Sequence, residues 1–240
     1  MSMNHLRRLA LATLLTTLLS ACATGPRTAE SDAGVRNVTV VTLLEEKAPI
    51  SRVGLTVFNN EVVEVDQGGE LNRLSRRLVE QHLRDKRPDW VIKDAGVDST
   101  MLAKKNREGG VSWTSFTGNI SDDLRRVAKA TGADLVFVVL DTTMENSPGR
   151  GVGLTLRTVS LSSVSNALVH AHVLLTLVDK DGKELTNRSG GNSLVPAAEL
   201  GIKYDVRASL KDPLVQRRVS DALKKQLSAS LDLAASSMGY

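Results

Sequence analysis

One residue near the start of the chain combines reactive chemistry with suitable neighbours. Cys22 is the only cysteine among 240 residues, and its thiol is the only strong nucleophile in this part of the sequence. Ser20 and Ala21 directly before it are small, so the backbone here can enter a narrow protease cleft. A lone cysteine excludes an intramolecular disulfide, a cysteine-rich zinc site and an iron–sulfur cluster. The sequence therefore predicts a modification at the Cys22 sulfur.

The residues before Cys22 have the pattern of an export signal. Arg7 and Arg8 form a short basic segment, and residues 9–19 are 11 uncharged Leu, Ala and Thr residues. That run is shorter than the roughly 20 residues needed to span a membrane but suits a signal peptide. The tetrapeptide Leu19-Ser20-Ala21-Cys22 closely resembles the lipobox of bacterial lipoproteins. The alternative is an ordinary secretory signal with an incidental cysteine.

The lipoprotein resemblance implies a specific processing route. The Cys22 thiol would be diacylglycerylated, the chain cut before Cys22, and the new amino group acylated. Three acyl chains hold a protein in a bilayer far more firmly than one. Ala23 stands where many inner-membrane lipoproteins carry Asp, which favours the outer membrane, with the body facing the periplasm. We therefore expect a signal peptide over residues 1–21, a flexible lipidated tether over 22–34 and one periplasmic domain over 35–240.

Composition fits an exported globular body. Hydrophobic residues make up 41% and charged residues 24%, which excludes a disordered chain and a multispanning membrane protein. The formal charge of +4 includes Arg7 and Arg8, so removal of the signal leaves a nearly balanced chain. Together with the expected compartment, this argues against a nucleic-acid partner.

Two histidines could share a metal ion. His170 and His172 alternate along a predicted strand, so both side chains point to one face of it. Two imidazoles would need further ligands to hold a metal. Leu168 and Leu174 lie on the same face, so a half-buried sheet surface explains the pair more simply. We predict no metal site.

Catalytic motifs are missing from the sequence. The glycine-rich residues 149–153 lack the Gly-Lys-Ser/Thr of a phosphate-binding loop, so we interpret them as the approach to a hairpin. The many serines include no Gly-x-Ser-x-Gly elbow. The carboxylate pair Asp122 and Asp123 fits helix capping, and Asp179 and Asp181 fit a turn. We expect a protein without catalytic residues or a cofactor.

The long segment over residues 95–119 is the most promising binding region. Trp113 and Phe116 belong to it and are two of only seven aromatic residues. Aromatic side chains are favoured as interface anchors, and long loops are often functional. The alternative is that both rings pack the loop onto the body. Residues 190–210 form a second candidate loop.

The remaining pattern alternates between strands and helices. Residues 38–44, 52–58 and 90–92 have strand character, and residues 61–69 are irregular or edge-like. Helices are expected at 70–86, at 121–131 and from Asp212-Pro213 to about residue 236. The wholly apolar residues 135–140 suit a central strand, followed by long antiparallel strands at 154–161 and 167–178. These predict a single α/β domain, with a mixed sheet of about five to seven strands and about three helices.

Three short stretches add a resemblance to a group of envelope modules. These stretches are Val53 to Phe58 with Asn59-Asn60, Ala128 to Val138 around Gly132-Ala133-Asp134, and the hairpin over residues 178–185. They resemble the amino-terminal domain of the translocation protein TolB, the curli secretion lipoprotein and the lipoprotein activators of penicillin-binding proteins. An additional leading strand at residues 35–44 and the long segment 95–119 depart from that group. The resemblance implies the architecture only.

The sequence therefore supports one functional expectation and two alternatives. We expect an outer-membrane-anchored lipoprotein that acts as a non-catalytic binding, scaffold or assembly component. Its partners would be the bilayer, through acylated Cys22, and an envelope protein or glycan. The alternatives are an oligomeric subunit of a secretion apparatus, which would insert the hairpin of residues 154–178, and an enzyme acting on envelope polymers.

Overall fold

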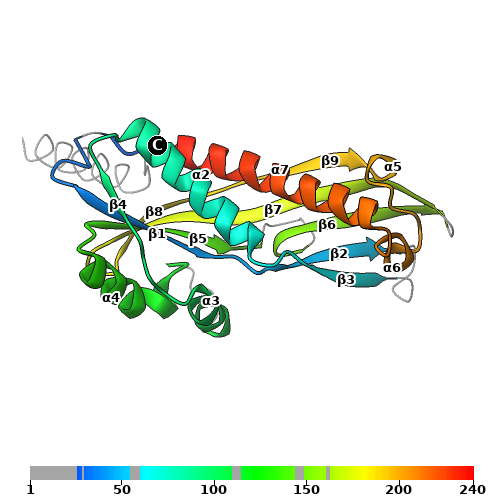
Figure 1. The fold of residues 1–240 in the computed structure, drawn as a ribbon, viewed down its shortest axis with the longest axis horizontal. Coiled ribbons are helices and arrows are strands. Elements are labelled where there is room, and N and C mark those ends of the chain that lie inside the picture. Colours follow the sequence, from blue (N-terminus) through cyan, green and yellow to red (C-terminus); the bar gives the residue numbers. More distant parts are fainter. Residues whose placement is uncertain (1–25, 29, 55–59, 110–114, 144–148, 161–162) are drawn as a thin grey trace, which may run out of the picture.

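The computed structural model describes residues 26–240 except residues 29, 55–59, 110–114, 144–148 and 161–162 (Figure 1). Nine strands form the sheet: β1 (Asn37–Leu43), β2 (Lys47–Val53), β3 (Glu61–Asp66), β4 (Val91–Lys93), β5 (Leu135–Asp141), β6 (Gly151–Ser160), β7 (Ser163–Asp179), β8 (Glu184–Ser189) and β9 (Asn192–Pro196). The described helices are α2 (Glu70–Lys86), α3 (Ser99–Glu108), α4 (Ser121–Thr131), α5 (Ala197–Leu200), α6 (Val206–Ser209) and α7 (Pro213–Met238), with a 3-10 turn, η2 (Gly118–Ile120). The predicted α/β class with a mixed sheet is confirmed.

The sheet consists of two halves that share the long strand β7. In one half, β4, β1 and β5 are parallel neighbours, and β5 and β8 flank the C-terminal part of β7. In the other half, β2 lies between β3 and β6, and β6 and β9 flank the N-terminal part of β7. Only β7 runs through both halves. The other strands begin or end at the boundary between the two halves, and we call this boundary the crease. The sheet is consequently long and narrow (Figure 1).

Strand β5 lies at the centre of the first half, and all seven of its residues are buried. Leu135, Phe137 and Val139 point into one hydrophobic cluster, and Val136 and Val138 point into another on the opposite face. A strand buried on both faces needs apolar side chains at every position, which explains why its sequence lacks alternation.

The larger cluster lies under α2 and α7, which cover one face of the sheet (Figure 1). Helix α7 begins at Pro213. The Asp212 carboxylate caps this helix by accepting a hydrogen bond from the Leu214 amide (2.8 Å). Its fully buried residues Val219, Leu223 and Leu227 recur every four positions, so one side of the helix faces the sheet. The three helices predicted at these positions and at α4 are confirmed.

Three local predictions differ from the structure. The predicted strand at 52–58 is wrong in its bounds: β2 covers Lys47–Val53, and residues 55–59 lie outside the described part. Pro49 fits within β2 because the ladder to β6 starts only at Ile50. Residues 61–66, expected to be irregular or edge-like, form the edge strand β3, which confirms the edge-like alternative. The candidate loops at 95–119 and 190–210 contain α3, β9, α5 and α6.

The start of the described chain is fixed to the end of α7. The Arg27 amide donates a hydrogen bond to the Met238 carbonyl (2.8 Å). Asp32 is 5% exposed and accepts hydrogen bonds from Arg27 (2.7 Å) and from the Tyr240 hydroxyl (3.2 Å). These residues fall in the segment that the sequence assigns to the tether. A search of the described helices finds none that is both long and apolar enough to cross a membrane.

Candidate partner-binding site

The structure describes one of the three residues that the sequence singles out. Cys22 and Trp113 lie outside the described residues. Phe116 lies just before η2, half-buried, and packs against the apolar cluster under α3 and α4. Its backbone amide donates to Glu184 Oε2 (2.9 Å), and Thr117 and Ser115 bond to the same oxygen. Phe116 thus packs its segment onto the body, and its role toward a partner stays a prediction.

The described residues before Phe116 include a helix where the sequence predicts a long loop. Helix α3 occupies its middle, and the Asp98 carboxylate caps it by accepting hydrogen bonds from the Thr100 and Met101 amides (2.9 and 3.1 Å). Leu102 and Ala103 are buried on its inner side. Asp98-Ser99-Thr100 is an N-cap signal in the sequence, so this helix was open to prediction from its capping residue.

A groove runs between α3 and α4. Its volume is about 330 Å³, and its apolar lining includes Val97, Leu102 and Val127. Met101 on its rim is 63% exposed, which is the largest exposure among the large hydrophobic residues of the described chain. A flexible thioether next to an apolar floor is a common feature of adaptable binding surfaces.

Charged side chains fix the other rim of the groove. Asp123 on α4 accepts a hydrogen bond from Lys105 on α3 (2.6 Å) and also pairs with Arg126. The hydrogen bond from Lys105 lowers the pKa of Asp123, so this carboxylate is ionised at neutral pH. The Lys105–Asp123 pair ties the two helices together. The groove therefore offers an apolar floor between the exposed Met101 and one ion-paired wall.

A second polar site lies at the crease, where β1 and β5 end. Asp141, the last residue of β5, accepts a hydrogen bond from the Glu45 amide (2.7 Å), and Arg107 from α3 lies 3.9 Å away. Burial raises the pKa of Asp141 to about 6, although the Glu45 amide and the cations Arg150 and Arg107 act in the opposite direction. Ligands of α/β proteins often bind where parallel strands end. Arg107 also lines a 230 Å³ pocket with Glu45 and Glu46, but Glu46 already caps the first turn of α2.

The histidine pair lies deeper than expected. The predicted half-buried surface is wrong: His170 and His172 are 1% and 0% exposed, and their rings stack with centroids 4.6 Å apart. The His170 ring fits at this depth because Gly149 and Gly153 have no side chains: a Cβ atom on either residue would collide with the ring. Burial lowers the pKa of His170 to about 4. Within the described chain, no three His, Cys, Asp or Glu residues are grouped to hold a metal ion.

No family model matches the sequence, and no curated protein matches it. The structure is similar to lipoprotein GNA1162 from Neisseria meningitidis, with 15% identity over 68% of this chain and 85% of that one and a TM-score of 0.29. It is similar to the LpoB C-terminal domain from Salmonella enterica, with 11% identity, 76% and 93% coverage and a TM-score of 0.24.

A third similar structure is a variant PelC dodecamer from Paraburkholderia phytofirmans. The identity is 12% over 87% of this chain and 94% of that chain, and the TM-score is 0.30. Identity to all three proteins is 15% or lower, so the functional assignment of this chain rests on its own residues.

Proposed function

We propose that this chain is a lipid-anchored protein of the bacterial envelope and that its folded body is a non-catalytic binding or assembly module. The observation that carries the proposal is Leu19-Ser20-Ala21-Cys22, placed directly after the apolar residues 9–19. The only cysteine of the sequence stands at the one position where the lipobox pattern requires it. Ala23 favours the outer membrane, with the body on its periplasmic side.

A short link would hold the body near the bilayer. Four residues separate Cys22 from Arg27, whose amide is bonded to the end of α7. At about 3.5 Å per residue, five peptide steps reach at most about 18 Å. The body would thus be confined to a thin layer beneath the membrane, where it meets other envelope proteins frequently.

The groove between α3 and α4 is the surface we assign to a partner. Its floor suits one or two apolar side chains of an envelope protein, and its one ion-paired wall suits polar groups around them. Met101 is exposed at the rim, where a partner side chain would cover it. We therefore expect the bound segment to insert an apolar residue beside Met101.

The anchor is tested by metabolic labelling with radioactive palmitate. The native chain should incorporate label and sediment with outer membranes. The variant Cys22→Ser should lose both properties, whereas Ser20→Ala, which keeps a small residue before the cysteine, should retain them. Unlabelled native protein, or an unlabelled Cys22→Ser variant that still fractionates with the outer membrane, would refute the proposal.

The groove is tested by photo-crosslinking in cells. A photoreactive residue at Met101 should give a discrete crosslinked band, identified by mass spectrometry. The same residue at Leu233 of α7, which is 55% exposed, is the matched control and should not give that band. The Val127→Glu variant places a charge on the groove floor and should abolish the band. Identical bands from both positions would show that the groove is not the specific surface.

A further inference from the structure

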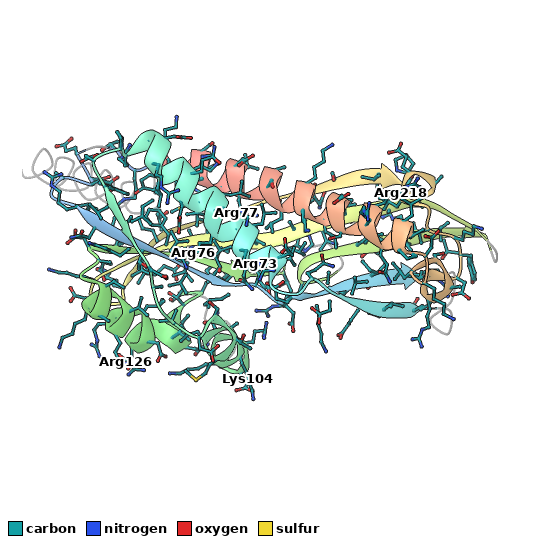
Figure 2. The ribbon with its side chains drawn as sticks, viewed as in Figure 1. Arg73, Arg76, Arg77, Lys104, Arg126 and Arg218 are labelled. Carbon is teal, nitrogen blue, oxygen red and sulfur yellow. The ribbon has the colours of Figure 1, made fainter. Side chains whose placement is uncertain are left out.

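The helical layer of α2 and α7 carries an excess of positive charge. The two helices contain nine of the 31 Lys and Arg residues of the sequence but only five of the 27 Asp and Glu residues. Their excess of four equals that of the whole chain. Figure 2 shows Arg73, Arg76 and Arg77 along α2 and Arg218 on α7.

Two of the five acids of this layer are each shared between two cations. Glu70 lies 2.7 Å from Arg73 and 3.6 Å from Lys224 of α7. Glu80 is likewise shared by two arginines, both on its own helix. Several exposed cations of the layer have no acidic side chain within ion-pair distance among the described residues: Arg77, Lys86, Arg217, Arg218 and Lys225.

The opposite face differs in how its charges are paired. Helices α3 and α4 also contain more cations than acids, but all except Lys129 have an acidic partner in the described chain. Lys104, for example, lies 3.8 Å from Glu108. An anionic surface would therefore gain more from facing α2 and α7 than from facing α3 and α4.

The attachment point lies at one end of the helical layer. The Arg27 amide is bonded to Met238, the last residue of α7, so the link to Cys22 leaves from there. Arg217 and Arg218 lie about 20 residues earlier in α7, or about 30 Å along its axis. If the molecule stood on this end, they would be well beyond the roughly 8 Å over which charges act at physiological salt.

We propose that the body lies along the membrane with the α2–α7 layer against anionic lipid headgroups. The inference rests on the proposed lipid anchor, because the anchor brings the layer within reach of the bilayer. Lying flat brings Arg217 and Arg218 near the start of α7 and Lys86 at the end of α2 to the lipid together. It also leaves the α3–α4 groove on the far side of the sheet, accessible to a protein partner.

Fluorescence quenching by lipid-borne nitroxides tests this orientation. The mature lipidated chain is reconstituted into vesicles of phosphatidylethanolamine with about one-third phosphatidylglycerol, a charged fraction that gives a negative surface potential. A fluorophore is attached at Gln81→Cys on α2 or at Ala130→Cys on α4, both exposed positions. Acylation occupies the Cys22 sulfur, so only the introduced thiol reacts.

Quenching should be stronger at position 81 than at position 130. The difference should be lost with neutral vesicles, in high salt, and in the triple variant Arg77→Gln, Arg217→Gln, Arg218→Gln. A matched triple variant, Lys104→Gln, Lys129→Gln, Lys180→Gln, removes the same charge elsewhere and should retain the difference. Equal quenching at both positions, stronger quenching at 130, or a difference insensitive to salt and charge would overturn the proposal.

The proposed lipid anchor and the proposed orientation on the membrane can be refuted independently. Palmitate labelling reports on the anchor alone. If labelling fails, the mature chain with Cys22→Ser and an N-terminal histidine tag is held on nickel-chelating lipids in the same vesicles, and the two positions are compared again. Stronger quenching at position 81 would then support the orientation without acylation, and equal quenching would refute it. A cationic face that binds only soluble anionic glycans would give no quenching difference and would count against the proposal.

Discussion

The Asp141 carboxylate fills the space that a side chain at position 151 would need. A Cβ atom placed on Gly151 meets Asp141 Oδ1 closer than real contacts allow, and Gly151 has a φ of +65°. Asp141 ends β5 and Gly151 begins β6, so this contact lies where the crease interrupts the sheet. Both the conformation and the space available at this position require glycine.

Replacing Gly151 should therefore destabilise the protein more than a conformational penalty alone. Gly151→Ala combines positive-φ strain of about 1 kcal/mol with a steric conflict against a buried carboxylate, for a loss of roughly 2–4 kcal/mol. Gly132→Ala is the control, because Gly132 has a φ of +67° and a methyl group there would have no atom within 4 Å. Urea unfolding of both variants checks this, and equal losses would contradict it.

The raised pKa of Asp141 gives a defined pH dependence. The folded protein holds this proton up to about pH 6, whereas an unfolded Asp releases it near pH 4. Stability should therefore fall as the pH rises from about 4 to 6, by up to roughly 3 kcal/mol from this group. Asp141→Asn should remove that contribution, as measured by unfolding free energies across this range.

Asp134 provides a control of opposite sign. Its pKa is lowered by hydrogen bonds from the Asn37 and Arg36 amides, so its contribution is present above the unfolded pKa and is lost as the pH falls. Asp134→Asn should destabilise most at neutral pH and least in acid. If Asp141→Asn gave the same trend as Asp134→Asn, the raised pKa of Asp141 would be wrong.

His170 should contribute a third pH dependence. Burial lowers its pKa to about 4, so the unfolded chain takes up a proton first as the pH falls below about 6.5. Stability should decrease between about pH 6.5 and 4, by up to roughly 3 kcal/mol from this group. His170→Gln cannot be protonated and should flatten this part of the curve. An unfolding curve whose pH dependence is unchanged by His170→Gln would argue against the prediction.

The contact between Asp32 and Tyr240 should be energetically coupled. Tyr240→Phe removes one hydrogen bond and should cost about 1 kcal/mol. Asp32→Ala also leaves Arg27 and Arg87 without their buried carboxylate and should cost roughly 3–5 kcal/mol. In a double-mutant cycle by denaturant unfolding, the two losses should be non-additive, since both remove the same bond. Strict additivity would show that the contact does not form in solution.

Sequence patterns succeeded where structure is set locally. Helices α2, α4 and α7 have apolar residues at helical spacing. Asp212-Pro213 marks the start of α7 and Gly132 marks the end of α4, because these residue types favour helix ends. The buried strand β5 was equally clear because it lacks any polar residue before Asp141. By contrast, β2 and β3 depend on each other for pairing, and neither has a strong pattern alone.

The candidate site was only partly accessible to sequence reasoning. The segment containing α3 stood out by its length, but the groove requires α3 and α4 to lie side by side, joined by Lys105 and Asp123, which are 18 positions apart. The sequence does not predict the burial of His170 because the glycines that make room for its ring lie in β6 and just before it. Only the pairing of β6 with β7 brings Gly153 opposite His170.

The sequence by itself determined the α/β class and the main helices, because each depends on neighbouring residues and short-range periodicity, and it predicts an export signal that ends at Cys22. Only the tertiary structure decided that Asp32 meets Tyr240, that the sheet breaks along a crease beside Asp141, and that the unpaired cations of α2 and α7 share one layer. Those relationships join residues far apart in the chain, and they exist only once packing of the two apolar clusters has fixed which elements become neighbours.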